Sequence, residues 1–398
     1  MLDLTDLDLF ADGAPHEAFR RLRDDDPVHW QEATAHTPGG EGFWNLTRHA
    51  DVRWAAREAA TFSSHTGGGR DGGGTLIEDL PDGWAAGVLF NMQDDPRHHH
   101  VRRLLTPSVS PRRLREIEAD LAVRTAAILD AVVERGSCDL LADVAVELPL
   151  QAIAALLGVP QDDRHLLRGW ADDTLDHEGR ELGETSERSA AAAAAMFGYG
   201  RELLAEKSRC PADDVMSIVA TADMTEFEQQ MAFNLLIAAG SETTRNSLTA
   251  GLLALSAHPD QWAAVRDDRR LLPGAVEEML RWSSATTYNR RTATVDVERH
   301  GRTIRAGDKV VLWWAAANFD GRVFADPMRF DVRRDPNPHL TFGMGTHFCL
   351  GAALARMEMR LVVDGLLDRV GGIEVVGPVV RTRSNKHTGF RSAPVRFS

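Results

Sequence analysis

Cysteine is scarce in this chain of 398 residues, and the three that occur, Cys138, Cys210 and Cys349, stand far apart. Such spacing gives no disulfide framework, so we expect a reducing, cytoplasmic environment. The acidic residues 1–13 lack the basic region of a signal peptide, and we find no run of about 18 apolar residues that could anchor the chain in a membrane. A net charge of −14 argues against nucleic acid as a partner. We therefore expect a soluble protein.

The hydrophobic content of 43% is enough to bury a sizeable core, and no internal repeat divides the chain. Helical periodicity dominates the pattern. It predicts helices over residues 117–161, 162–176, 187–208 and 225–258, with a polar connection over 177–187. Alternating patterns predict β-rich parts near residues 28–47, 285–315 and 373–398. The glycine-rich, weakly periodic residues between 63 and 93 predict a long loop, either a surface linker or a loop with a function.

A glycine-rich stretch, FGMGTHFCLG at residues 342–351, contains the most informative cysteine. Apolar residues recur at helical spacing from Gly351 to Val370, so Cys349 is predicted to lie where a loop enters a helix. The free N–H groups at a helix N-terminus favour an anionic sulfur, and glycines allow a flat group to lie close to the backbone. One thiolate on such a loop suits haem iron better than zinc.

Three alternatives are open for this cysteine. Cys349 could form a zinc site with His347, but zinc needs more thiolates or histidines at short spacing, and the sequence offers none nearby. Cys349 could instead be a nucleophile, or it could be a small buried apolar residue with no chemical role.

The helix predicted over residues 225–258 begins with a capping box, in which Thr225 is the cap and Glu228 follows three residues later. Its apolar middle indicates a core helix, yet that middle carries the sequence AGSETT at residues 239–244. A buried carboxylate beside an alcohol, here Glu242 beside Thr243, can hold water and relay protons where a glycine loosens the helix. The alternative is a kinked helix whose polar groups are satisfied.

Residues 97–115 contain six arginines and no acidic residue, although the chain as a whole is acidic. His98 and Arg102 are four residues apart, so on a helix they share a face and could bind one anion together. The other arginines could form a docking patch or a merely solvated surface. Glu278 and Arg281 are three residues apart, a spacing that by itself usually indicates a surface ion pair.

Together these motifs resemble the cytochrome P-450 family of the soluble bacterial type. The cysteine loop matches F-G-x-G-x-H-x-C-x-G at every fixed position, and H-x-x-x-R, A-G-x-(D/E)-T-T and E-x-x-R precede it in the family's order. The resemblance covers nearly the whole chain. It implies a single triangular, mainly α domain over residues 1–398, with a smaller β-rich part and with haem b between the long central helix and the cysteine loop.

The resemblance also assigns chemical roles. Cys349 would ligate the iron, Glu242 would be the acid of a proton relay, and Thr243 would be the alcohol near bound dioxygen. Haem contacts carried over from the family's pattern are His98, Arg102, Ala239, Arg291, Phe342, Gly343, His347 and Gly351. The sequence departs from the family's preferences at His100, Val109 and Phe319.

Structural and substrate-binding roles follow in the same way. Glu278, Arg281 and Arg334 would form a buried group that braces the cysteine loop. Residues that would face the substrate are Phe90, Ile237, Ala238, Thr286, Thr287, Tyr288, Lys386 and His387. If Lys386 and His387 point inward, the substrate should be an oxygenated or acidic molecule with a hydrophobic body. The alternative is that both side chains reach water.

The implied activity is that of a haem-thiolate monooxygenase, which inserts one oxygen atom of O2 into a small hydrophobic substrate by hydroxylation or epoxidation. We expect a natural product of secondary metabolism, such as a terpenoid, steroid or polyketide-like molecule, and electrons from NAD(P)H through a reductase and a ferredoxin. The ferredoxin would dock on a monomer near Arg97, Arg103, Arg112 and Arg113. Two alternatives are an atypical member that performs ring coupling, nitration or peroxide-driven oxidation, and a non-catalytic haem binder.

Overall fold

The computed structural model describes residues 2–174 and 186–398. Its largest sheet has the strand order β1, β2, β10, β7, β3, formed by Val28–Gln31, Phe43–Leu46, Lys309–Trp313, Tyr288–Ala293 and Phe62–Ser63. Strand β10 pairs antiparallel with β7 and parallel with β2. A parallel pair needs a long crossover connection. Here that connection, from β2 to β10, contains most of the helices.

The other strands are short and lie near the loops of the chain. Within the glycine-rich loop, β4 (Gly72–Gly73) pairs with β5 (Leu80–Pro81), so this loop has some regular structure. A three-stranded sheet has the order β11, β14, β6, formed by Ile373–Val375, Pro394–Phe397 and Ser137–Asp139. Two further pairs are β8 (Val297–Arg299) with β9 (Arg302–Ile304), and β12 (Val380–Arg381) with β13 (Phe390–Ser392).

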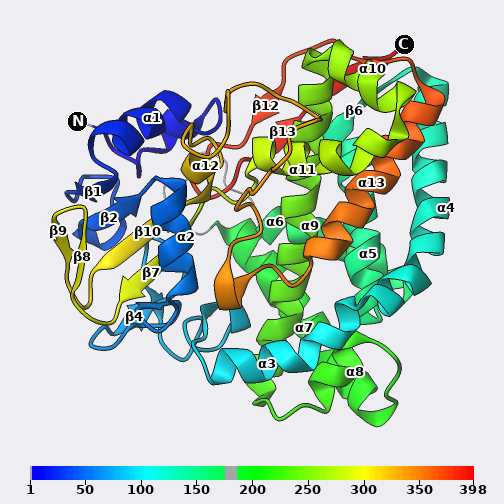
Figure 1. Ribbon diagram of the computed structural model, residues 1–398. Coiled ribbons are helices and arrows are strands. Elements are labelled where there is room, and N and C mark those ends of the chain that lie inside the picture. The colour runs from blue at the N-terminus through cyan, green and yellow to red at the C-terminus, as the bar shows by residue number, and fades with distance from the viewer. Residues whose placement is uncertain (1, 175–185) are drawn as a thin grey trace.

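Helices make up the larger part of the fold, as the predicted fold class requires. Figure 1 shows the long helices α4, α5, α9 and α13 on the side away from β1, β2, β7 and β10. The helices before the central one are α1 (His16–Asp25), α2 (His49–Arg57), α3 (Arg97–Leu105), α4 (Pro111–Arg135), α5 (Glu147–Leu157), α6 (Arg164–Thr174), α7 (Glu187–Arg209) and α8 (Val215–Ala220). The central and later helices are α9 (Glu226–Ala257), α10 (Pro259–Asp267), α11 (Leu272–Ser283), α12 (Trp314–Ala317) and α13 (Ala352–Arg369).

Helix α9 runs through the middle of the molecule, and its predicted capping box is confirmed. The Thr225 hydroxyl accepts a hydrogen bond from the Glu228 N–H at 3.2 Å, and the Thr225 N–H donates to the Glu228 carboxylate at 2.8 Å. The helix is unbroken from Glu226 to Ala257, so Gly240 does not interrupt it. Gly240 instead permits a close approach of α5, because a Cβ atom there would lie 2.8 Å from the Ile153 side chain.

The single helix predicted over residues 117–161 is wrong. Helix α4 ends before Gly136, whose left-handed φ of 72° suits glycine. Strand β6 and a π-helical turn over residues 140–145 separate α4 from α5. Helices α6 and α7 lie close to the predicted 162–176 and 187–208. Most of the predicted connection over 177–187 lies outside the described residues.

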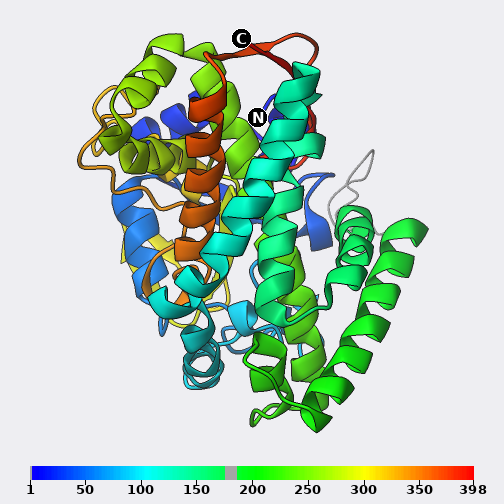
Figure 2. The same cartoon turned by 90° about the vertical axis from the view of Figure 1, so that its right-hand side faces the viewer.

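One apolar stretch escaped the sequence analysis. By length and composition Leu140–Leu157 could cross a membrane, with a mean hydropathy of 1.8. It is 78% buried inside the protein, as a core helix of a globular protein would be. Side chains of α4, α5, α9, α11 and α13 share the largest buried apolar cluster. In Figure 2 α13 (orange) lies beside α4 (blue-green).

Candidate active site

The cysteine loop, residues 342–351, immediately precedes α13. The N–H of Cys349 donates to the carbonyl of Phe342 at 2.8 Å and so closes the loop. Gly345 has a left-handed φ of 74°, and a Cβ atom there would lie 2.6 Å from a carbonyl oxygen of α2. Glycine is therefore required at this position for both its conformation and its lack of a side chain. Cys349 stands just before α13 begins, in agreement with the predicted junction of loop and helix.

The sulfur of Cys349 faces an internal cavity, which accounts for its exposed surface. Burial raises the pKa of this thiol, and the Gly351 N–H together with the charges of Arg102 and Arg356 only partly opposes that rise. Burial thus opposes the anionic sulfur that a helix N-terminus favours. A coordinated metal ion would favour the thiolate, because it displaces the thiol proton.

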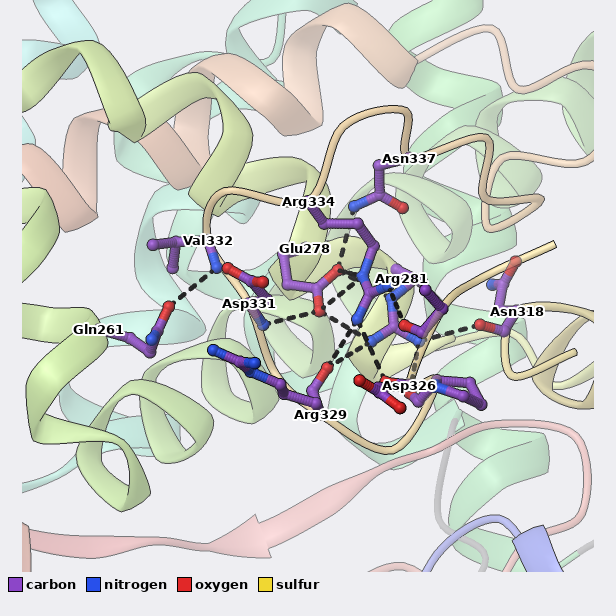
Figure 3. Close-up of polar contacts among 12 residues, drawn as sticks. Gln261, Glu278, Arg281, Asn318, Asp326, Arg329, Asp331, Val332, Arg334 and Asn337 are labelled. Carbon is purple, nitrogen blue, oxygen red and sulfur yellow. Dashed lines mark hydrogen bonds and ion pairs between the residues drawn. The ribbon is translucent and has the colours of Figure 1, made fainter. Parts of the chain in front are cut away.

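Glu278, Arg281 and Arg334 form a buried ion-pair group (Figure 3). Arg281 donates two hydrogen bonds to Glu278 at 2.7 and 2.8 Å, and Arg334 lies 3.2 Å from the same carboxylate. The exposed fractions of the three side chains are 0% for Glu278 and Arg281 and 8% for Arg334. Asn337 adds a hydrogen bond to Glu278 at 3.0 Å. The structure thus brings together the three residues predicted to form the brace.

Asn318 connects this group to the cysteine loop. Arg281 donates to its carbonyl at 3.0 Å. The Asn318 side chain donates to the Thr341 hydroxyl at 3.0 Å and accepts from the Leu340 N–H at 2.6 Å. Sequence reasoning missed Asn318, because its partners are separated from it by more than twenty residues.

A second missed contact supports the loop from α13. Arg356 donates to Glu277 at 2.6 and 2.7 Å, and its guanidinium carbon lies 4.5 Å from the centre of the Phe342 ring. Burial alone would raise the pKa of Glu277, but hydrogen bonds from Arg356 and His339 lower it to about 2. The sequence offered a weak indication of this contact, since Glu277 directly precedes the E-x-x-R motif and Arg356 follows the cysteine loop.

A cavity of about 310 Å³ separates the cysteine loop from α9. The loop contributes Phe342, Gly343, His347, Cys349 and Gly351 to its lining, and α9 contributes Ala239, Gly240, Thr243 and Thr244. Two segments more than ninety residues apart in the sequence therefore meet at one internal space.

Four basic side chains line the same cavity: His98, Arg102, Arg291 and His347. The rings of His98 and His347 lie 4.1 Å apart. Burial lowers the pKa of Arg291 to about 10 and that of His347 to about 2. The Nε2 atom of His98 is buried and has no hydrogen-bond partner among the described residues. Such an arrangement favours a ligand that brings negative charge.

The acid and the alcohol of AGSETT do not face the same way. Thr243 lines the cavity, and its hydroxyl donates to the Ala239 carbonyl at 3.2 Å. Glu242 is buried outside the lining, with its carboxylate 3.7 Å from Nε2 of His387. Thr243 and Glu242 can therefore pass protons between the cavity and the region on the other side of α9.

Comparison with known proteins decides the family. Residues 205–370 match the cytochrome P450 family. The chain is 45% identical over 405 residues to cytochrome P450 126 of Mycobacterium tuberculosis, covering 100% of this chain and 97% of that one. It is 34% identical to the steroid C26-monooxygenase of Rhodococcus jostii, covering 99% and 84%. The chain is a cytochrome P450.

A solved structure of the family agrees with this assignment. Cytochrome P450 CYP268A2 of Mycobacterium marinum, in complex with pseudoionone, superposes with a TM-score of 0.90 at 33% identity and covers 100% of this chain and 98% of that one. The predicted family, fold class and enzyme class are thereby confirmed, and the chain is a cytochrome P450 monooxygenase.

A cytochrome P450 binds a haem iron, and the described residues fit such a group. The cavity lies between the Cys349 thiol and α9, and glycines of the loop leave room for a flat ring. The basic residues of the lining suit the carboxylates of a haem, which could also satisfy the Nε2 of His98 that has no partner among the described residues. Cys349 would hold the iron, as the thiolate does throughout this family.

The residues predicted to contact substrate separate into two groups. Phe90 and Thr286 line the cavity of this cytochrome P450. Ile237 and Ala238 are not among its lining residues, because α9 turns Leu236, Ala239 and Gly240 toward it instead. Asn289, in the segment expected to face the substrate, also lines the cavity, whereas Asn91 and Ser247 are lining residues that sequence reasoning missed. Helical spacing from Gly240 and Thr243 could have indicated Ser247.

The idea that Lys386 points into the pocket is wrong for this structure. Its ammonium group donates to the Tyr288 carbonyl at 2.8 Å and lies 4.4 Å from the centre of the Tyr288 ring. Burial lowers the pKa of Lys386 to about 7. Thr287 donates its hydroxyl to the Asn385 carbonyl, and His387 approaches Glu242, so none of these side chains lines the cavity.

The predicted docking arginines differ in their surroundings. Arg97 is bound to Glu228 at 2.5 Å, and both Arg112 and Arg113 are paired with Glu116. Arg103 is exposed and has no ion-pair partner among the described residues. It lines a surface depression of about 460 Å³ together with His99, Arg102, Thr106, Pro107, Gly345 and Thr346. This depression lies beside the cysteine loop.

Proposed function

We propose that this cytochrome P450 inserts one oxygen atom of O2 into a hydrophobic molecule of the steroid or terpenoid type, with haem b as its cofactor. One observation carries the proposal: Cys349 and Thr243 line the same cavity, the first from the cysteine loop and the second from α9. Haem iron with a thiolate ligand supplies the activation of dioxygen. The described residues then determine which molecule is bound and how protons reach it.

Each residue has a distinct part in this proposal. Cys349 is the iron ligand. His98, Arg102 and Arg291 would hold the haem carboxylates, whose negative charge suits these basic lining residues. The Thr243 hydroxyl holds a proton at the cavity wall, and Glu242 supplies protons from behind α9.

The cavity lining supports a mostly apolar substrate with a small number of oxygen atoms. Its apolar side chains include Phe90, Ile153, Leu156, Leu235 and Leu236. Its uncharged polar side chains include Asn91 and Thr286, and a substrate hydroxyl or carbonyl would satisfy them. The steroid C26-monooxygenase relative is consistent with this chemistry.

We place the docking site of an acidic ferredoxin over the depression beside the cysteine loop. Arg103 supplies an uncompensated positive charge there, whereas the other predicted arginines have acidic partners. Charges at the rim of an interface mainly accelerate association. Electrons from NAD(P)H would arrive through a reductase and this ferredoxin.

Two measurements test the proposal. The reduced protein with carbon monoxide should show the red-shifted Soret band of thiolate-ligated haem, and Cys349→Ser should abolish it while Cys138→Ser retains it. With a surrogate reductase and ferredoxin, NADPH should then be consumed in the presence of dioxygen and androstenedione or geraniol, with an oxygenated product. A histidine-type carbon monoxide spectrum would exclude Cys349 as ligand. A thiolate spectrum without NADPH-dependent oxygen consumption would favour a peroxide-driven member or a haem carrier.

A further inference from the structure

The tip of the C-terminal hairpin, residues 382–389, is fixed to the protein interior. The Thr287 N–H donates to the Lys386 carbonyl at 3.0 Å, and the Thr388 N–H donates to the Ala285 carbonyl at 2.9 Å. Asn385 is fully buried and donates its side-chain amide to the Leu4 carbonyl at 2.9 Å. The tip is therefore held by residues 285–287 and by Leu4 near the N-terminus.

These contacts determine where His387 lies. An antiparallel bridge places His387 opposite Thr286, a residue that lines the cavity. The neighbouring Lys386 is held against Tyr288, so the backbone on that side cannot turn without breaking the ammonium contact. The imidazole is thus presented to α9 by a well-anchored loop.

His387 lies between a buried acid and the protein surface. Its Nε2 atom is 3.7 Å from the Glu242 carboxylate, and the side chains are 18% and 9% exposed. The small space that His387 lines together with Arg381, Thr382 and Ser384 has no room for a water molecule, so His387 meets solvent only through the exposed part of its side chain. Charged groups near it include Glu242 of α9 and the adjacent Lys386 of the tip, and the charges of Glu242 and of Arg291 in β7 act on Lys386 in turn.

We propose that His387 receives protons from solvent at the exposed part of its side chain and passes them to Glu242. This inference rests on the proposed function, in which Glu242 supplies protons to the Thr243 hydroxyl. A proton leaves Nε2 of the imidazolium for the Glu242 carboxylate, and the neutral imidazole takes the next proton from water. Histidine suits this step because its unperturbed pKa, about 6.5, allows it to gain and lose a proton near neutral pH. His387 acts through Glu242 and is a positioning residue.

The first test measures the coupling of the two side chains. The protein contains 15 histidines, so the His387 signal of histidine-labelled protein in the diamagnetic carbon-monoxide form is identified by its loss in His387→Gln. Replacing Glu242 by glutamine removes a negative charge at 3.7 Å and should lower the His387 pKa by about one unit. Asp26→Asn, next to the separate His29–Asp26 pair, should leave the His387 pKa unchanged. An unchanged His387 pKa in Glu242→Gln overturns the proposal.

The second test measures proton delivery without an identified substrate. Dioxygen takes up two protons with two electrons even when it leaves as hydrogen peroxide, so the rate of NADPH-driven oxygen consumption at saturating surrogate ferredoxin reports proton supply. His387→Gln should lower this rate about tenfold and increase its solvent deuterium effect. His387→Lys keeps a positive charge, but its pKa of about 10.4 should prevent release of the proton, so it should also be slow. His29→Gln is the matched control.

The outcomes separate this proposal from the proposed function. A wild-type rate in His387→Gln, or full recovery in His387→Lys, would show that the side chain supplies at most charge and would overturn the relay. If the wild-type protein consumes no oxygen with NADPH and any surrogate partner, the proposed electron source fails instead. The titration of His387 then still decides whether it is coupled to Glu242.

Discussion

Replacing Glu278 by glutamine should destabilise the protein by about 3–5 kcal/mol, the usual cost of removing one partner from a buried ion pair. The structure shows why the upper part of that range is expected. Glu278 is fully buried, and its carboxylate accepts from both Arg281 and Arg334. Removing its charge leaves two guanidinium groups without a carboxylate, whereas Arg334→Met leaves the Glu278–Arg281 pair intact and should cost about 1.5–3 kcal/mol.

Thermal unfolding gives the scale of the effect. The unfolding entropy is about 2.1 cal/mol/K per residue, so a chain of 398 residues has about 0.8 kcal/mol/K, and Glu278→Gln should lower Tm by about 4–6 °C. Differential scanning calorimetry of the haem-loaded protein measures the shift. Arg334→Met provides a second point if Glu278→Gln does not fold.

The matched control is an exposed ion pair. Arg396 lies 2.6 Å from Glu374, and both side chains are 60% exposed, so Arg396→Met should change Tm by less than about 1 °C. Equal shifts for Glu278→Gln and Arg396→Met would refute the reasoning that burial gives the pair its importance. A smaller decrease in Tm for Glu278→Gln than for Arg334→Met would refute the expectation that Glu278 contributes more to stability than Arg334.

Three further predictions concern single residues. Thr243→Ala should retain haem and ligand binding but release more hydrogen peroxide per NADPH, because the hydroxyl at the cavity wall is lost; unchanged peroxide yield would remove Thr243 from the relay. Burial raises the pKa of Glu358 well above its ordinary value, so the stability contributed by its protonated form falls as pH rises from about 4.5. In urea unfolding, the free energy of unfolding of Glu358→Gln should therefore increase relative to that of the wild type at pH 8 and not at pH 4. An equal difference between the two proteins at both pH values would contradict this. Arg103→Glu should raise the ferredoxin concentration for half-maximal turnover and weaken its salt dependence, whereas Arg396→Glu, on an unrelated exposed pair, should change neither.

Local signals account for what the sequence predicted well. The capping box of Thr225, the position of Cys349 before a helix and the i, i+3 spacing of Glu278 and Arg281 all depend on residues close together in the chain. Such patterns are set by helix geometry, which is the same in every protein. Their order along the chain then identified the fold through the family.

Contacts between distant segments account for what could not be predicted. The pairing of Arg97 with Glu228 bridges 131 residues and removed an arginine from the expected docking patch. Lys386 binds a carbonyl 98 residues away, which no periodicity of its own short hairpin indicates. The break after α4 depended on one glycine, Gly136, whose left-handed conformation ends a helix that the hydrophobic pattern would continue.

Helix α11 explains how these separate contacts position one reaction site. Its adjacent carboxylates hold the segments on the two sides of the cysteine loop. Glu278 holds the segment before the loop through Arg334, and Glu277 holds α13 after the loop through Arg356. The same helix packs against α9, where the Ser283 hydroxyl donates to Ser247 at 3.2 Å. The loop that carries the thiol and the helix that carries the hydroxyl are therefore both fixed relative to α11. Because α11 fixes the positions of both the cysteine loop and α9, the width of the cavity between them depends on α11 rather than on the loop or α9 alone.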